Sequence, residues 1–239
     1  MKEAGLTIHP KKCALAKEET SYLGLVLGRG VIRPQVGKVE AIMAAERPTT
    51  KKQVRSFLGL VGWYRRFIPN FSEKAVVLTE LTRKCQPNKV DWTEECEAAF
   101  KDLKGSLCKE PVLLSPDFEK LFTVQTDASE RGLRAVLLQG DSGQLQPVAY
   151  ISRKLLPREC NYSTVEKECL AIKWALDSFR YYLLGRKFVL ETDHRALSWL
   201  GQMRDSNARI TWWFLAVQPF DFDVLYRAGK LNCTADTQN

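Results

Sequence analysis

The sequence predicts an α/β protein in which a mixed five-stranded sheet is flanked by helices and preceded by a β-hairpin and a small helical unit. In the second half of the 239 residues, strand-like and helical runs follow one another in the order β-β-β-α-β-α-α-β. This alternation is typical of a mixed sheet that is covered on both faces. In the first half, apolar residues recur at helical spacing after two short strands. We therefore expect three parts: residues 1–35 as the hairpin, 36–111 as the helical unit and 112–239 as the sheet domain.

Glycine, proline and threonine mark the elements of the first two parts. Residues 13–33 predict two short strands around the turn Gly28-Arg29-Gly30. One helix follows and is stopped by Pro48, and a second runs from a Thr50 cap to Pro69. Two more helices are expected over roughly residues 72–84 and 91–107.

The third part opens with "LFTVQTDASERGLRAVLLQ" at residues 121–139. Its alternating apolar residues predict a β-hairpin, with Ser129 to Gly132 as the turn. The elements expected after it are the strand "PVAYISRKL", a helix from about Ser163 to Tyr182, the strand "FVLETDH", short helices around 194–202 and 209–217, and the strand "FDFDVLYRAG".

Composition narrows the functional class. The formal net charge is +8, and residues 1–118 carry an excess of six positive charges against two in residues 119–239. A basic front half indicates a polyanionic partner, most commonly nucleic acid. The seven cysteines form no C-x-x-C pair and only two histidines accompany them, so reduced thiols are a better interpretation than a zinc site. The start "MKEAGLTIHP" lacks the apolar core of a signal peptide, so we expect a cytoplasmic or nuclear protein without a membrane partner.

Two aspartates stand at the ends of predicted strands. Asp127 follows the first strand of the hairpin, and Asp193 ends "FVLETDH". Aspartate is a common residue at turns, so Asp127 alone predicts little. Strand ends of an α/β sheet, however, are where ligands bind. Two acids at neighbouring strand ends repel each other unless cations lie between them, which favours a metal site.

Two glutamates on the long helix are separated by helix geometry. Ser163 and Glu166 form a capping box, which gives Glu166 a structural role. At about 100° per residue, Glu168 lies at the edge of the apolar stripe that faces the sheet. A solvated position there is as reasonable as a ligand role. A further candidate, Asp236, is also interpretable as a helix N-cap or as part of a loose tail, because only three residues follow it.

Several long motifs resemble one known family. "TDAS", "NYSTVEKECLAIKWAL", "ETDHRAL" and "AGKLNCTAD" resemble the ribonuclease H domain of gypsy-type LTR-retrotransposon polyproteins. "SYLGLVLGRGVIRP" and "FLGLVGWYRRFIPNFSEKA" resemble the end of the reverse-transcriptase palm and the thumb-to-connection region of the same polyproteins, and "VDWTEECEAAFKDLKGSLCKEPVL" resembles the segment that leads into ribonuclease H. The resemblance covers nearly the whole chain and implies a ribonuclease H-like sheet.

The resemblance also implies a catalytic site. The family's metal-binding Asp-Glu-Asp-Asp set falls on Asp127, Glu168, Asp193 and Asp236. Hard carboxylate oxygens suit two Mg²⁺ or Mn²⁺ ions, which in such sites lie about 4 Å apart and assist in-line attack of water on phosphorus. The implied substrate is the RNA strand of an RNA–DNA hybrid, told from DNA by its 2′-hydroxyls. The rest of a retroelement polyprotein is a further possible partner, and the oligomeric state is not predicted.

Some residues are expected to contact the duplex. In "WYRRF" at residues 63–67, Arg65 and Arg66 are candidates for phosphate contacts. For the aromatic residues of this motif, packing in the core is the favoured interpretation. Ser129 and Arg153 complete the set of expected nucleic-acid contacts.

The chain departs from the family pattern in several places. It contains no "DD" pair, so we expect no DNA synthesis. Arg134 stands where the family usually has glycine, the last acid is followed only by "TQN", and "ITWWF" replaces a pattern that often contains "RW". If Asp127 and Arg134 lie opposite each other across the hairpin, the arginine would pair with the aspartate and inhibit metal binding. A non-catalytic nucleic-acid-binding or interaction protein is therefore the main alternative. An integrase of the same fold is disfavoured, because the second acid is a helical glutamate after three strands and no H-H-C-C module is present.

Overall fold

The computed structural model describes residues 13, 16–109, 111–140, 144–192 and 208–226. Its first part is a small antiparallel sheet in the order β1-β2-β3-β4, formed by Glu19–Tyr22, Leu25–Gly28, Val31–Pro34 and Leu113–Leu114. The expected turn at residues 28–30 is present, with Arg29 at φ 51° and Gly30 at φ 73°. A second turn, in which Leu23 (φ 47°) and Gly24 (φ 81°) adopt positive φ, makes three strands where two were expected.

The strand β4 connects the front sheet to a distant part of the chain. Leu113 pairs with Ile32, and Leu114 pairs with Val31. Leu113 is buried and packs in the core of the helical unit. The expected sheet domain therefore begins with a two-residue strand that pairs with the front sheet, a pairing too short and too distant in sequence to be detected by its pattern.

The helical unit lies between these strands in the sequence. It consists of α1 (Val36–Met43), α2 (Lys51–Trp63), the 3₁₀ turn η3 (Arg65–Phe67), α3 (Phe71–Lys74), α4 (Val76–Glu80) and α5 (Glu94–Cys108). The Thr50 cap is confirmed, because its side chain accepts from the Gln53 amide in a capping box. The helix expected over residues 72–84 is instead broken at Ala75 and ends at Glu80. The β-branched Val76, Val77 and Thr79 weaken helix formation there.

The second sheet has five strands in the order β7-β6-β5-β8-β9. These are Gln146–Lys154, Gly132–Gln139, Phe122–Ala128, Lys187–Thr192 and Asp221–Tyr226. β5, β6 and β7 are antiparallel neighbours, while β8 runs parallel to both β5 and β9. The sheet is therefore mixed and five-stranded, as predicted.

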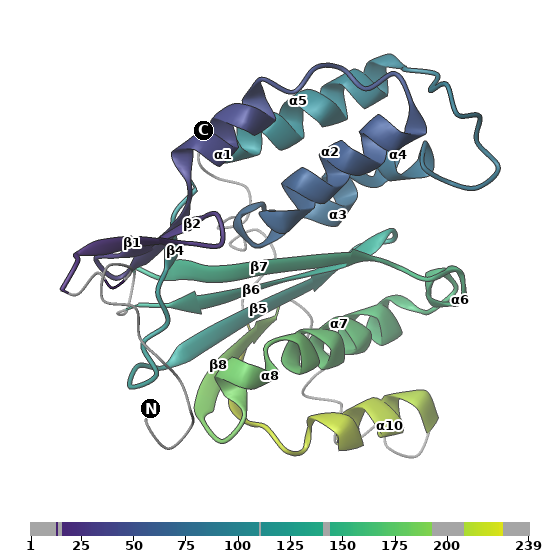
Figure 1. The fold of residues 1–239 in the computed structure, drawn as a ribbon. Coiled ribbons are helices and arrows are strands. Elements are labelled where there is room, and N and C mark those ends of the chain that lie inside the picture. The colour runs from purple at the N-terminus through teal and green to yellow at the C-terminus, as the bar shows by residue number, and fades with distance from the viewer. Residues whose placement is uncertain (1–12, 14–15, 110, 141–143, 193–207, 227–239) are drawn as a thin grey trace, which may run out of the picture.

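Helices cover both faces of this sheet, as Figure 1 shows. On one face lies the helical unit, whose α3 and η3 contact β7. On the other lie α7 (Thr164–Ser178), which contacts β5 and β6, and α10 (Ala208–Val217), which packs on α7. The short helices α6 (Pro157–Cys160) and α8 (Arg180–Leu183) flank α7, so the helix expected from 163 to 182 is divided after Ser178. The helix expected around 194–202 lies outside the described residues.

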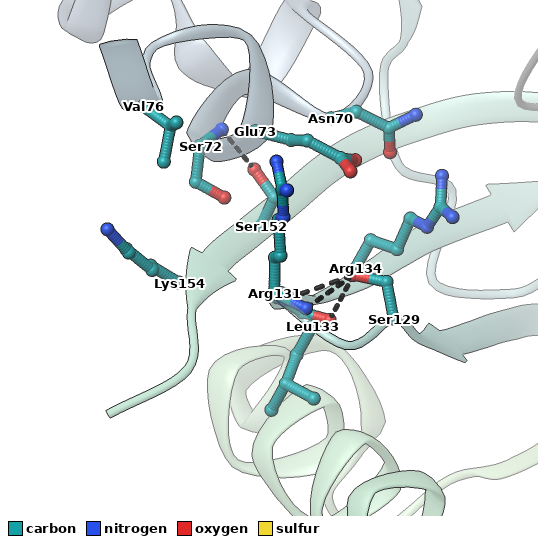
Figure 2. Close-up of a pocket in the computed structure, with 11 residues that line it drawn as sticks. Asn70, Ser72, Glu73, Val76, Ser129, Arg131, Leu133, Arg134, Ser152 and Lys154 are labelled. Atoms are coloured by element: carbon teal, nitrogen blue, oxygen red, sulfur yellow. Dashed lines mark hydrogen bonds between the residues drawn. The ribbon is translucent and has the colours of Figure 1, made fainter. Parts of the chain in front are cut away.

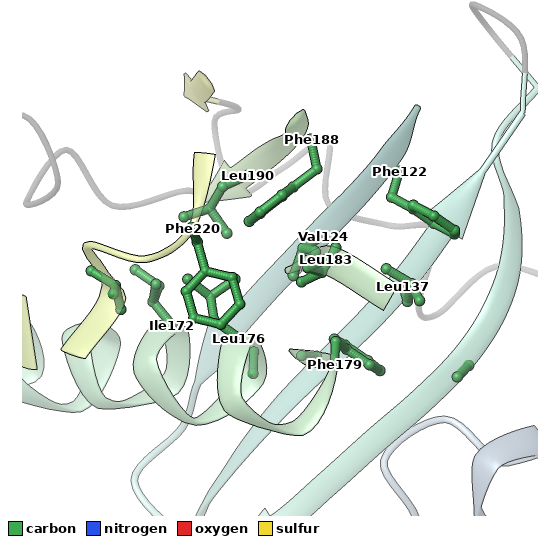
Figure 3. Packing of buried hydrophobic residues seen from close by; sticks show 14 of the residues in the cluster. Phe122, Val124, Leu137, Ile172, Leu176, Phe179, Leu183, Phe188, Leu190 and Phe220 are labelled. Carbon is green, nitrogen blue, oxygen red and sulfur yellow. The ribbon is translucent and has the colours of Figure 1, made fainter. Parts of the chain in front are cut away.

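Two main apolar cores hold these layers together. Figure 3 shows the core between the sheet and α7, where Phe122 and Val124 of β5 meet Ile172 and Leu176. The second core lies within the helical unit and includes Val54, Phe57 and Phe100. Tyr150 of β7 packs against this second core, which ties the helical unit to the sheet. Among the described helices, none combines the length and apolar character needed to cross a membrane.

Candidate active site

Asp127 lies near the carboxyl end of β5, the central strand of the sheet. Its neighbours Thr126 and Ala128 face α7, since Thr126 pairs with buried Ala135 and Ala128 packs in a cluster with residues of α7. Because side chains alternate along a strand, Asp127 projects from the opposite face, which carries the helical unit. Its side chain is 36% exposed, so the carboxylate is accessible from the strand end.

Arg134 faces Asp127 across the hairpin. The two residues are directly paired in the register of β5 and β6, and Arg134 Nε forms an ion pair with Asp127 Oδ2. The turn that sets this register is held by Ser129, whose backbone N–H donates to the Gly132 carbonyl at 2.9 Å and whose Oγ accepts from the Gly132 N–H at 3.0 Å. The expected cross-strand contact between Asp127 and Arg134 is therefore present.

Glu168 lies on the buried side of α7. The helix starts at the predicted capping box, in which the Ser163 side chain accepts from the Glu166 amide and the Glu166 carboxylate accepts from the Ser163 N–H at 2.9 Å. Glu166 also accepts from Arg209 on α10 at 2.6 Å. Glu168 is only 5% exposed. The capping role predicted for Glu166 is thus confirmed, and Glu168, for which helix phase left a solvated position open, is buried.

The pKa of Cys169, the residue next to Glu168, is raised by its surroundings. Burial raises the pKa of Cys169 to about 11, and the nearby carboxylates of Glu168 and Glu166 add to the increase. A buried thiolate beside carboxylates is costly, because burial and like charge both disfavour it. Cys169 therefore packs as a neutral residue.

The four predicted ligands are only partly within the described residues. Asp127 projects from the sheet face opposite to α7, whereas Glu168 lies on α7, the helix that contacts β5. Asp193, directly after β8, and Asp236 lie outside the described residues. The convergence of all four acids stays a prediction.

A buried polar pair lies near Asp127 and was not predicted. Gln125 donates from Nε2 to Glu191 Oε2 at 2.6 Å, and both side chains are buried. Gln125 shares the sheet face of Asp127, two residues before it, and pairs with Glu191 on the parallel strand β8. The polar residues Gln125 in "FTVQTD" and Glu191 in "FVLETD" were the only sign of this pair in the sequence. Strand alternation alone predicts that such polar residues face solvent, so the pair was missed.

The residues predicted to contact nucleic acid lie in different environments. Arg65 is exposed, whereas Arg66 donates to the Tyr182 hydroxyl at 3.2 Å. In the same motif Tyr64 and Phe67 are 2% exposed and belong to the core, as favoured, whereas Trp63 is 56% exposed. Ser129 uses its hydroxyl within the hairpin turn.

Arg153, also expected at the nucleic-acid surface, is held within the fold. Its guanidinium donates to both carboxylate oxygens of Glu159, at 2.6 and 3.2 Å, and lies over the Trp174 ring. The Glu159 carboxylate also accepts from the Leu156 N–H at 2.9 Å. Arg153 thus has a structural role within the fold. Its geometry does not support the expected contact with phosphate.

A cleft separates the helical unit from the hairpin beside Asp127. Figure 2 shows Asn70 and Glu73 on one side and Ser129, Arg131 and Arg134 on the other. The Ser72 N–H donates to the Ser152 hydroxyl at 2.9 Å and closes one wall. Basic, acidic and hydroxyl groups all line this cleft. The Arg134 side chain therefore has polar groups of the cleft beside it in addition to Asp127.

Comparison with solved structures defines the class of fold. The chain superposes on the foamy viral protease-reverse transcriptase in complex with dsDNA with a TM-score of 0.77 and 23% identity, over 92% of this chain and 47% of that one. It superposes on the same protein in complex with an RNA/DNA hybrid with a TM-score of 0.75 and 23% identity, over 96% and 32%. Together with the strand order, this likeness defines the sheet domain as ribonuclease H-like.

Sequence comparison finds relatives among retrotransposon polyproteins. Residues 92–190 match the RNase H-like domain found in reverse transcriptase. The retrovirus-related Pol polyproteins from transposons 297 and gypsy of Drosophila melanogaster are 41% and 36% identical, each over 98% of this chain. The Tf2-3 transposon polyprotein of Schizosaccharomyces pombe is 33% identical over 99%. The chain therefore matches a segment of the Pol polyproteins of LTR retrotransposons, gypsy among them. It spans about a fifth of the length of these relatives, between 18% and 23%.

Proposed function

We propose that the sheet domain cleaves the RNA strand of RNA–DNA hybrids with the help of two divalent metal ions. The observation that carries this proposal is the placement of Asp127 at the carboxyl end of β5 together with a buried Glu168 on α7, the helix that packs against that strand. Asp127 and Asp193 each stand two residues beyond the paired Gln125 and Glu191. The similarity to Pol polyproteins supports this substrate, and so does the similarity to the foamy viral protease-reverse transcriptase, which was solved in complex with an RNA/DNA hybrid.

Two of the described residues have side chains of the kind that bind divalent metal ions, although the described part of the chain contains no cluster of three or more such ligands. Asp127 and Glu168 supply the carboxylate oxygens that Mg²⁺ and Mn²⁺ prefer, and Asp193 and Asp236 would complete the set. Bound ions of this kind lower the pKa of a water molecule and stabilise the charge that develops on the leaving oxygen. One carboxylate oxygen of Asp127 is already paired with Arg134, so a metal ion would have to compete with the arginine for it.

The protein's own residues would position the reaction. Glu168, held by the capped start of α7, would supply an anchored carboxylate from the α7 side. Asp127, partly exposed at the strand end, would face the substrate. Exposed Arg65 would bind backbone phosphates, which fix the position of a duplex without reading its sequence.

Cleavage of a labelled hybrid tests this function directly. A duplex with 5′-labelled RNA is incubated with the full chain in Mg²⁺, Mn²⁺ or EDTA, and the products are separated by size. We expect cleavage in either metal and none in EDTA, with Asp127→Asn and Glu168→Gln both inactive. Glu130→Gln is the matched control, because it removes an exposed carboxylate from the same hairpin turn. Cleavage that persists in EDTA or in Asp127→Asn would refute the proposal.

A second function is supported by the ion pair between Arg134 and Asp127. If the arginine excludes metal ions completely, the chain binds hybrid or partner proteins without cleaving RNA. The same assay separates the two functions, since that chain would retard the labelled hybrid in a native gel while leaving the RNA intact in both metals.

A further inference from the structure

We infer that Arg134 acts as a built-in counter-cation that competes with divalent metal ions for Asp127. This inference rests on the proposed function, because it assigns a regulator to the same metal site. Its basis is the ion pair between Arg134 Nε and Asp127 Oδ2, formed by residues directly opposite each other on β5 and β6.

The backbone fixes this contact. The register from Phe122–Gln139 to Ala128–Leu133 is continuous, and the Ser129–Gly132 hydrogen bonds close the turn next to it. Directly opposed side chains project to the same face with their Cβ atoms about 5 Å apart. The guanidinium is therefore held near the carboxylate without any rearrangement of the loop.

The pair lies in a partly desolvated position. The side chains of Arg134 and Asp127 are 32% and 36% exposed, and Arg134 also lines the cleft against the helical unit. In such surroundings the interaction of charges is stronger than in bulk water, although solvent still screens much of it. The positive charge of Arg134 partly neutralises the negative charge of Asp127, which would otherwise attract a metal ion.

Metal binding then has two costs. The carboxylate oxygen must be released from the guanidinium, and a divalent ion placed beside the remaining Arg134 is repelled by it. The cleft offers a place for the displaced side chain, since Asn70 and Glu73 line its other side. Arg134 would therefore lower metal affinity without abolishing the site, and its removal would strengthen binding.

The experiment measures Mn²⁺ binding to the full chain by isothermal titration calorimetry and by loss of the free-ion electron paramagnetic resonance signal. Arg134→Gln removes the charge and preserves a strand-compatible side chain, and Arg134→Gly tests the smallest residue. We expect both to bind Mn²⁺ at least about tenfold more tightly than the unmodified chain. Arg134→Lys, which keeps the charge, should remain weak.

Two further variants make the outcomes distinct. Arg131→Gln removes the same charge from an exposed position in the same hairpin and should leave the Mn²⁺ affinity within about twofold. Asp127→Asn in the Arg134→Gln background should remove the gain. Equal affinity in Arg134→Gln and the unmodified chain, or an equal gain in Arg131→Gln, would overturn the inference while leaving the metal site intact. Absence of saturable binding in every variant would instead refute the proposed function.

Discussion

At the scale of single residues, the partly buried Arg153 forms an ion pair with the buried Glu159, and the loss of this pair should destabilise the protein. Glu159 is 5% exposed and is bound at both oxygens by Arg153. We expect Arg153→Ala to lower the free energy of unfolding by about 2–3 kcal/mol, because a buried carboxylate is left without its cation. Urea denaturation measures this, and Arg158→Ala, an exposed arginine next to Glu159, should change it by less than about 0.5 kcal/mol.

The same pair predicts a pH dependence. Burial raises the pKa of Glu159, but hydrogen bonds from Arg153 and the Leu156 N–H outweigh it and leave the pKa below its ordinary value of 4.5. A carboxyl with a lowered folded-state pKa stabilises the protein above its unfolded pKa and loses that contribution as the pH falls through the folded one. The destabilisation caused by Glu159→Gln should therefore shrink as urea unfolding is repeated from about pH 6 down to about pH 3. A constant difference across this range would contradict the assignment.

Residue roles were predictable where local geometry decides them. Helix phase and the capping box distinguished Glu168 from Glu166, and the turn length placed Arg134 opposite Asp127. Arg153 could not be recognised as a structural residue, because its partner depends on how α6 folds back after β7. The Gln125–Glu191 pair depends on two strands that are 66 residues apart and become neighbours only in the folded sheet.

At the scale of elements, the capping box of α7 should stabilise the helix that carries Glu168. We expect Ser163→Ala to lower the free energy of unfolding by about 1 kcal/mol, since the Glu166 amide loses its acceptor. Ser178→Ala at the other end of the helix is the control. Its hydroxyl only donates back to the Trp174 carbonyl within the helix, so the effect should be smaller. Similar losses in both variants, measured by urea denaturation, would argue against a special role for the cap.

Elements were predictable when their signal was local and strong. The Thr50 cap located the start of the second helix, although α2 ends at Trp63 and not at Pro69, and the sequence pattern located all five strands of the large sheet. The two-residue strand β4 escaped prediction because only its pairing with β3 defines it. The break at Ala75 was not predicted, because the apolar residues continue at helical spacing on both sides of it. The β-branched residues that follow Ala75 weaken the helix, but the spacing alone does not show this.

At the scale of the whole molecule, the helical unit and the sheet domain should unfold together. Among the described residues, polar contacts connect them at Ser72 N–H to the Ser152 hydroxyl, at Arg66 to the Tyr182 hydroxyl, and at Lys154 to Glu80 at 2.6 Å. Tyr150 of β7 also packs in the core of the helical unit. We expect tryptophan fluorescence and far-ultraviolet circular dichroism to report coincident urea transitions. Two separated transitions would show that the units are independently stable.

The distribution of charge over the molecule predicts how it binds a hybrid duplex. Residues 1–118 carry an excess of six positive charges, and Arg65 is exposed on η3, a turn that contacts β7 of the sheet domain. Neutralised phosphates release counterions, so each lost phosphate contact lowers the magnitude of the slope of log K against log salt concentration by about 1. Arg65→Ala should do this and weaken binding, whereas Arg65→Lys should keep the slope because the charge remains. Fluorescence anisotropy with labelled hybrid in EDTA, where no cleavage is expected, measures both quantities across a salt series. An unchanged slope in Arg65→Ala would place the duplex away from η3, and the excess charge of the front half would then act only as a long-range field that attracts nucleic acid.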